Sequence, residues 1–202
     1  MPYAEQLGRS KKKTWEEKLI GNGKFAKNIV NLFGDDKEIE FSRADLFESA
    51  KNDDLDNFLA KVIVWGYPRG PRGDNFSSIC KNIGSIKKLL TSANKGISDW
   101  QSHFDKLSKI DGIGMSTYTK FLYFKRVKIG ELPALILDIQ VINALKRDVF
   151  LELKEISNIR NSNAHKFYPN YLACAHNIAT KFDTDADRVE MFLFQYGDSL
   201  KT

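Results

Sequence analysis

Cysteine is scarce in this chain. Cys80 and Cys174 are the only two cysteines among 202 residues, and they stand far apart in isolated contexts. Two cysteines cannot build a disulfide framework, a four-cysteine zinc site or a four-cysteine iron–sulfur cluster within one chain. We therefore expect two buried thiols in a reducing compartment and no iron–sulfur cofactor.

Long apolar runs are also absent. No stretch approaches the roughly 18 apolar residues that a membrane-spanning helix needs, and the N-terminal region carries no apolar signal-peptide core. The 42% of hydrophobic residues is nevertheless enough for a packed core. We expect residues 1–202 to form one monomeric, cytoplasmic domain that binds no membrane.

Histidine is rare, and its positions do not suggest catalysis. His103, His165 and His176 lack the spacing of metal ligands and have no evident serine or cysteine partner. We expect structural or surface roles for them and no metal site.

Alternating strand patterns extend over no more than a few residues, whereas helical spacing recurs along the chain. Helices are predicted at 115–126, 139–149, 167–182 and 186–197. Helix starts are predicted from a cap at Ser42 and from capping boxes at Thr14 with Glu17 and at Ser98 with Gln101. The predicted fold class is all-α.

Charge is distributed unevenly along the chain. Residues 35–56 hold nine acidic and three basic residues, whereas residues 57–128 hold thirteen basic and four acidic ones. A basic stretch with interleaved aromatics is typical of a surface that binds nucleic acid, because lysine and arginine release counterions from phosphates. A solvated basic face is the alternative.

A Gly-x-Gly joint separates two helical patterns near the middle of the chain. Gly112 and Gly114 permit unusual backbone angles and leave the main chain uncovered. Backbone amides here, with the N-terminus of the next helix, can donate hydrogen bonds to a phosphate without reading sequence. The predicted phosphate-binding residues are Gly112, Ile113, Gly114, Met115, Ser116 and Thr117. The alternative is a simple glycine-terminated helix joint.

An acidic residue interrupts the apolar run 134–145. Burying Asp138 as an ion costs several kcal/mol unless it is paired, capping or functional. Capping the helix that begins near Ile139 is its simplest role.

These two features together resemble the helix-hairpin-helix DNA glycosylase superfamily, in particular the 8-oxoguanine glycosylase-like fold of the bacterial-type branch. The family's signature is a glycine hairpin followed about twenty residues later by an aspartate in an apolar context, and Asp138 lies 24 residues after Gly114. By motif, the resemblance covers roughly residues 98–145, with the helix-hairpin-helix at about 99–124. It implies a two-lobed helical fold that binds double-stranded DNA and extrudes a modified base.

The resemblance also implies roles in catalysis. Asp138 would stabilise the positive charge that develops on the deoxyribose or orient the attacking water. Relatives that also nick the strand carry lysine at the position of Ser116, so hydrolysis without strand cleavage is the first expectation. Lys120 lies one helical turn further on. We interpret it as solvated or phosphate-facing, and a role for it as the strand-cleaving nucleophile is the alternative. A binding protein without excision chemistry is a second alternative.

Two positions depart from the family pattern. Asp111 stands where the family usually has proline, and Tyr118 where it usually has a small residue. The negative charge of Asp111 would be offset by a monovalent cation at the hairpin, which the family often holds. No other cofactor is expected.

The Gly/Pro-rich basic loop at 65–75 looks like the region where 8-oxoguanine glycosylases place residues that fill the space left by the extruded base. Arg69, Arg72 and Asn75 are the candidates for this contact, and Trp65 and Tyr67 are the candidates for stacking on the base. An exposed loop and buried aromatics are the alternative. An oxidised purine, removed in base excision repair, is the first expectation for the substrate.

Overall fold

The structure, a computed structural model, describes residues 5–199 and is mostly helical. Its α-helices are α1 (Lys12–Glu16), α2 (Gly23–Asn31), α3 (Arg43–Asn52), α4 (Leu55–Gly66), α5 (Asn75–Ser92), α6 (Trp100–Leu107), α7 (Met115–Phe124), α8 (Ile139–Lys146), α9 (Ala164–Lys181) and α10 (Ala186–Tyr196). The shorter elements are the strands β1 (Leu7–Lys11), β2 (Glu38–Ser42), β3 (Lys128–Ile129) and β4 (Leu132–Pro133) and the 3-10 helices η2 (Leu151–Ile156) and η3 (Gly197–Ser199).

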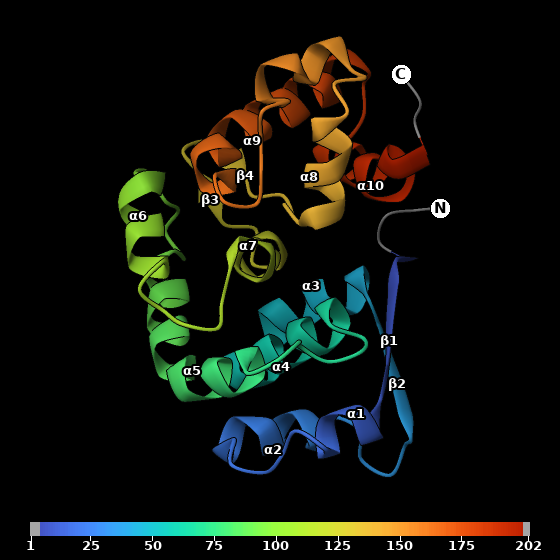
Figure 1. Cartoon of the computed structure of the whole chain (residues 1–202), viewed down its shortest axis with the longest axis vertical. Helices are drawn as coiled ribbons and strands as arrows, with labels where there is room; N and C mark the ends of the chain where they lie inside the picture. The colour runs from blue at the N-terminus through green and yellow to red at the C-terminus, as the bar shows by residue number, and fades with distance from the viewer. Residues whose placement is uncertain (1–4, 200–202) are drawn as a thin grey trace.

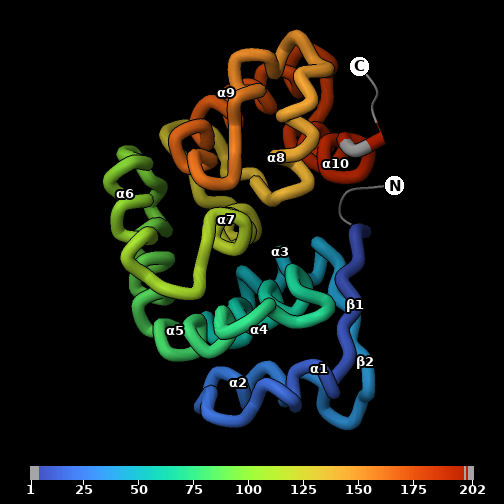
Figure 2. The backbone as a smooth tube through the Cα atoms, in the orientation of Figure 1, coloured from blue at the N-terminus to red at the C-terminus, as the bar shows by residue number. Residues whose placement is uncertain are grey.

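Helix α7 lies at the centre of the molecule (Figure 1). One group of elements, α1 to α4 with β1 and β2, lies on one side of it, and α8 to α10 lie on the other. The chain enters α7 from α5 and α6, which run along one edge (Figure 2). One cluster of buried apolar side chains extends through both groups.

The central position of α7 follows from its sequence. Its residues from Met115 to Phe124 are buried, apart from the half-buried Ser116. A helix that is apolar on all sides is typically enclosed by other elements. Its polar residues Thr117, Thr119 and Lys120 therefore lie in the protein interior.

The sequence predicted most helices within a few residues. The predicted spans 115–126, 139–149, 167–182 and 186–197 correspond to α7, α8, α9 and α10. Ser42 caps α3 as predicted, in a reciprocal capping box with Asp45. Two capping predictions are wrong: Thr14 lies inside α1, which Lys11 precedes, and α6 is capped by Asp99 rather than by Ser98.

The antiparallel pair β1 and β2 escaped the sequence prediction, and its burial pattern explains why. The buried positions of β1 are Gly8 and Ser10, so the inward face carries no apolar signal. Across the pair of strands, Nη2 of Arg9 on β1 lies 2.8 Å from Oε2 of Glu40 on β2. A strand that packs small residues inward and pairs charges outward does not show the alternation by which strands are recognised.

Pro169 lies inside α9 without loss of a buried hydrogen bond. Proline has no N–H to donate to the carbonyl four residues earlier, which here belongs to His165. That carbonyl accepts from Nε1 of Trp100 instead, at 2.7 Å. The indole N–H of Trp100 thus takes the place of the missing backbone N–H of Pro169, and this hydrogen bond joins α6 to α9.

Candidate active site

The joint between α6 and α7 uses its two glycines differently. Gly112 has a φ of +89°, and a Cβ there would lie 2.6 Å from Cβ of Ser78 and 2.7 Å from the backbone nitrogen of Ile79. It is therefore required for close packing on α5. Gly114 is exposed, precedes the first residue of α7 and has no heavy atom near the position of a Cβ. No side chain caps the N-terminus of α7, so its first amides have no capping side chain as acceptor.

A buried hydrogen bond fixes the angle between α6 and α7. Nε2 of His103 lies 2.6 Å from the hydroxyl of Tyr118, which is completely buried. Burial raises the pKa of Tyr118 and lowers the pKa of His103, so this pair is uncharged at neutral pH. The bulky residue that departs from the family pattern is thus accommodated by a partner on the facing helix.

Asp138 performs two tasks with its two carboxylate oxygens. Oδ1 accepts from the backbone nitrogens of Gln140 at 3.0 Å and Val141 at 3.2 Å, which caps α8 as predicted. Oδ2 lies 3.7 Å from Nζ of Lys120. The capping bonds hold the carboxylate rigidly while leaving its second oxygen directed at a buried amine.

The extended segment that leads to Asp138 is held by side chains from neighbouring helices. The hydroxyl of Tyr168 donates to the carbonyl of Leu135 at 2.8 Å, and that of Tyr171 donates to Ile136 at 3.1 Å. The backbone nitrogen of Leu137 donates to Oγ1 of Thr119 at 3.1 Å. A buried backbone needs such partners, and here they fix the position of Asp138 relative to α7.

Lys120 is not solvated, and this corrects the sequence interpretation. Its side chain is 9% exposed, and Nζ donates to the carbonyl of Ser116 at 3.1 Å and to Oγ of Ser116 at 3.0 Å. Its place on an all-buried helix explains why it is enclosed. Burial lowers the pKa of Lys120, and the nearby carboxylate of Asp138 opposes that shift.

The end of α4 borders the same amine. A Cβ at Gly66 would lie 3.3 Å from Cδ of Lys120, so the alkyl chain passes close to this glycine. The hydroxyl of Tyr67 is hydrogen bonded to Oγ1 of Thr117, next to Ser116. Tyr67, a predicted pocket residue, is therefore brought to the edge of the site.

Trp65, the other predicted pocket residue, is part of the core. Its side chain packs edge-on against Phe124, with ring centroids 5.4 Å apart, and the guanidinium of Arg43 lies 5.7 Å from its centre. Nε1 of Trp65 donates to the carbonyl of Gln6 at 3.4 Å. The residue is 7% exposed and lies on the inward face of α4, so this structure places it in the core.

The basic loop lies beside the glycine joint. Arg69, Arg72 and Asn75 are exposed, and the carbonyl of Asn75 would lie 2.9 Å from a Cβ on Gly112. Asn82 lies about two helical turns after Asn75 on α5. Its Nδ2 donates to the carbonyl of Asp111 at 3.2 Å. The start of α5 thus lies against the hairpin at Asp111 and Gly112, whereas the predicted contact residues Ile113, Met115 and Thr117 have buried side chains.

The sequence analysis missed a buried ion pair between Arg43 on α3 and Glu190 on α10. Both side chains are at most 1% exposed, and the guanidinium binds the carboxylate through two contacts of 2.6 and 3.1 Å. Glu190 interrupts an apolar stretch of α10, the same signal that drew attention to Asp138. The signal was present, but its partner is 147 positions away.

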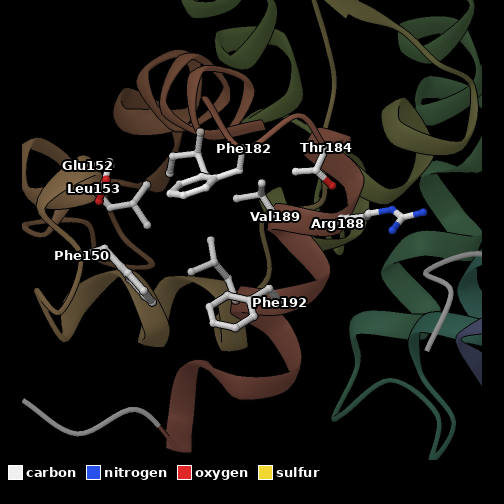
Figure 3. A pocket seen from close by; sticks show the side chains of 10 residues that line it. Phe150, Glu152, Leu153, Phe182, Thr184, Arg188, Val189 and Phe192 are labelled. Carbon is white, nitrogen blue, oxygen red and sulfur yellow. The ribbon is translucent and has the colours of Figure 1, made fainter. Parts of the chain in front are cut away.

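Helix α10 also lines an apolar cavity of about 450 Å³, through residues other than Glu190. This cavity is separate from the site of Lys120 and Asp138. Phe182, Val189 and Phe192 point into it, with Phe150 and Leu153 facing them, whereas Arg188 extends away (Figure 3). Its walls carry none of the predicted catalytic residues.

The cysteines and histidines have structural environments. Burial raises the pKa of Cys80 to about 11 and that of Cys174 to about 12, which leaves both as thiols at neutral pH. The ring of His165 stacks on Phe104, and His176 is hydrogen bonded to the carbonyl of Pro133.

Residues 5–199 hold neither a metal-binding cluster nor a membrane-spanning helix. Within that part of the chain, no three or more histidine, cysteine or acidic side chains are arranged to hold a metal ion. No helix described there is both long and apolar enough to cross a membrane.

Comparison with known proteins identifies the family of the chain. No curated protein and no solved structure matches the chain. One family does match, over residues 3–194, and it is described as "Putative 8-oxoguanine DNA glycosylase OGG-like protein". Because this match spans nearly the whole sequence, the chain belongs to the OGG-like DNA glycosylase family.

Proposed function

We propose that this protein is a DNA glycosylase that excises a modified base with Lys120 as its nucleophile and then cleaves the strand. The observation that carries the proposal is the buried amine of Lys120, 3.7 Å from the carboxylate of Asp138. An amine with a lowered pKa beside a fixed carboxylate is the arrangement that covalent catalysis at a sugar carbon requires. This replaces hydrolysis, the first expectation from sequence, with its strand-cleaving alternative.

Binding of DNA would use the glycine joint as a helix-hairpin-helix anchor. The uncapped start of α7 and the exposed Gly114 offer backbone amides to a phosphate. The adjoining loop adds the exposed side chains of Arg69 and Arg72. These contacts are independent of sequence, so they suit an enzyme that searches duplex DNA for a rare lesion.

The position of the anchor suits extrusion of a nucleotide toward Lys120. The hairpin and the amine share α7: the phosphate-binding end of the helix lies at Met115, and Lys120 follows little more than one turn later. Asn75 and the arginines of the loop, which are exposed, would occupy the space that the extruded base leaves. Tyr67 and Gly66 would form the nearest wall of the base pocket.

The chemistry follows from the two groups. The uncharged Nζ of Lys120 attacks C1′, the bond from C1′ to the base breaks, and the base leaves with the electron pair and takes up a proton. Asp138 stabilises the positive charge that develops on the sugar. Loss of a proton from nitrogen and opening of the sugar ring give an imine, and removal of a C2′ proton then expels the 3′ phosphate.

The substrate is proposed from the family rather than from pocket contacts. The family description names 8-oxoguanine, so an oxidised purine in double-stranded DNA is the first candidate, with base excision repair as the process. We also retain a monomer in the cytoplasm as the proposed state and location, and a monovalent cation near the hairpin as a proposed ligand.

The test uses duplexes carrying 8-oxoguanine opposite cytosine or adenine, uracil, hypoxanthine and alkylated purines. Wild-type protein is expected to nick one of these without alkali and to form a covalent adduct when borohydride reduces the imine. Lys120→Met should abolish both products. Lys125→Met, at the other end of α7 against Phe58, is the matched control and should retain them.

Two results would contradict the proposal. Products that appear only after hot alkali, with no trapped adduct, would show that water is the nucleophile and that Asp138 acts in hydrolysis. Tight duplex binding with no product from any lesion in the panel would favour a binding protein without excision chemistry.

A further inference from the structure

A buried hydrogen bond lies directly beside the two proposed reacting groups. Thr119 precedes Lys120 on α7, and its side chain is completely buried. Its partner Leu137 precedes Asp138, the cap of α8. The backbone nitrogen of Leu137 donates to Oγ1 of Thr119 at 3.1 Å, so this bond joins the sequence neighbours of the carboxylate and of the amine.

The hydroxyl of Thr119 is used on both sides. A hydroxyl both accepts and donates, and after accepting from Leu137 it donates to the carbonyl of Ser116 at 3.4 Å. That carbonyl also accepts from Nζ of Lys120 at 3.1 Å. One hydroxyl and one carbonyl thus connect the amine to the segment that ends in Asp138.

The other bonds that hold this segment come from different helices. Two tyrosine hydroxyls of α9 donate to its carbonyls, and Asp138 itself is bound to the first amides of α8. Helices α8 and α9 lie together on one side of α7 (Figure 1). These contacts fix the carboxylate to α8 and α9, whereas the bond from Thr119 fixes it to the helix that carries Lys120.

We propose that Thr119 is a positioning residue, and that its hydroxyl holds the carboxylate of Asp138 in place against the amine of Lys120 during base excision. This inference rests on the proposed function of those two residues. Thr119 touches no reacting atom. It keeps at 3.7 Å two groups that separate helices would otherwise place independently.

A purely structural bond is the competing explanation, because the N–H of Leu137 needs a partner in the protein interior. The two explanations predict different results. A structural bond contributes to the free energy of unfolding alone. A positioning bond also determines how strongly base excision depends on the charge of Asp138.

Two substitutions separate the hydroxyl of Thr119 from the volume of its side chain. Thr119→Val nearly keeps the shape but leaves the N–H of Leu137 without an acceptor, whereas Thr119→Ser keeps the hydroxyl and opens a small cavity. Both are expected to lower the unfolding temperature. Only Thr119→Val is expected to disturb the position of Asp138.

The test measures base excision in single-turnover experiments on a duplex with 8-oxoguanine opposite cytosine, or on whichever duplex of the panel the wild type cleaves. Excision should fall about tenfold in Thr119→Val and stay within about twofold of the wild type in Thr119→Ser. Duplex affinity, measured by titration, should be the same in all three proteins. Thermal unfolding of each variant reports the structural damage separately.

Combination with Asp138→Asn gives a result that structural damage alone does not produce. In the wild-type background, this substitution removes a charge that is held at a fixed distance from the amine. In the Thr119→Val background the charge is no longer held there, so the loss of excision caused by Asp138→Asn should be about tenfold smaller. In the Thr119→Ser background that loss should equal the loss in the wild type.

Ser49→Ala is the matched control. Ser49 is buried on α3, and its hydroxyl donates to the carboxylate of Asp53. The variant therefore also removes one hydrogen bond of a buried hydroxyl. Its excision rate should equal that of the wild type, and the loss caused by Asp138→Asn should be undiminished in its background.

The outcomes separate this inference from the proposed function. Excision that falls equally in Thr119→Val and Thr119→Ser, or that follows the unfolding temperature across all variants, would overturn the inference and leave Lys120 as the nucleophile. Losses that simply multiply in the double variant would overturn it as well. If Thr119→Val does not fold, Thr119→Ala takes its place in each comparison. No product from the wild type with any duplex of the panel would overturn the proposed function, and this inference with it.

Discussion

Replacing Asp138 by asparagine separates its capping role from its charge. Asparagine caps helices about as well as aspartate, and its carbonyl oxygen can keep the two bonds to the backbone nitrogens of Gln140 and Val141. The capping contribution to the free energy of unfolding is therefore expected to change by less than about 0.5 kcal/mol, apart from the cost of leaving the buried amine of Lys120 without its carboxylate partner. Asp138→Ala loses the cap and should cost about 1 kcal/mol.

The loss of charge should have a larger effect on excision. A unit charge about 4 Å from an opposite charge contributes about 4 kcal/mol at the effective dielectric of a protein surface, and Oδ2 lies 3.7 Å from the amine that approaches the sugar. A carboxylate at this distance from the developing positive charge makes a contribution of similar size, which corresponds to roughly a 10³-fold loss of base excision in Asp138→Asn.

The same substitution should spare the reaction at a preformed abasic site. No glycosidic bond breaks there, and the variant removes the carboxylate that favours the charged form of Lys120. Imine trapping at neutral pH is therefore expected to remain or to increase, whereas Lys120→Met should eliminate it.

Two parallel assays check this prediction: base release from a lesion duplex, and borohydride trapping on an abasic duplex. Excision by Asp138→Asn at the wild-type rate would falsify the electrostatic role of this carboxylate. Loss of both reactions in Asp138→Asn with an unchanged unfolding temperature would show instead that the charge is needed to place the lysine.

Four further predictions concern α7 and its neighbours. Gly112→Ala places a Cβ 2.6 Å from Ser78 at a positive φ and should lower stability by roughly 2–4 kcal/mol in thermal unfolding. Gly114→Ala meets no neighbouring atom, so it should cost no more than about 1 kcal/mol yet weaken duplex binding in a titration at fixed salt. Gly66→Ala should change the free energy of unfolding by no more than about 1 kcal/mol. It should reduce imine trapping about tenfold, because the new Cβ would lie 3.3 Å from Cδ of Lys120. An unchanged trapping rate would contradict this contact. Because burial lowers the pKa of Lys120, the wild-type trapping rate should rise with pH and level off below about 10.4, and a limb at or above that value would contradict the burial argument.

Much of this site was predictable because its signals are local. The glycine joint, the cap at Asp138 and the spans of α7 and α8 each depend on residues close together in sequence. The strand β1 was missed because its buried positions are glycine and serine. Its partner strand β2 lies about 30 residues further along the chain, so the pairing cannot be recognised from a short stretch of sequence.

The interior charges illustrate a different limit. Glu190 in an apolar helix indicated a buried acid, but only the three-dimensional structure shows which of the many basic residues neutralises it. Arg43 follows directly after the cap of α3, a position that is usually exposed, and is buried because α3 packs against both α4 and α7. Partner identity in a buried ion pair is a property of the tertiary fold.

Lys120 shows that the position of a residue in the sequence and the position of its side-chain nitrogen can differ by a helical turn. The sequence comparison placed the family's reactive lysine at Ser116, one turn earlier, and therefore favoured hydrolysis. Side chains on a helix lean toward its N-terminus, and one turn is about 5.4 Å, a distance that an extended lysine side chain can span. The amine of Lys120 accordingly lies 3.0 Å from Oγ of Ser116, at the level where the family's lysine begins. A residue is aligned by its Cα, whereas a side chain acts at its end, so a one-turn displacement in sequence still leaves the amine of Lys120 beside Asp138, where the proposed reaction needs it.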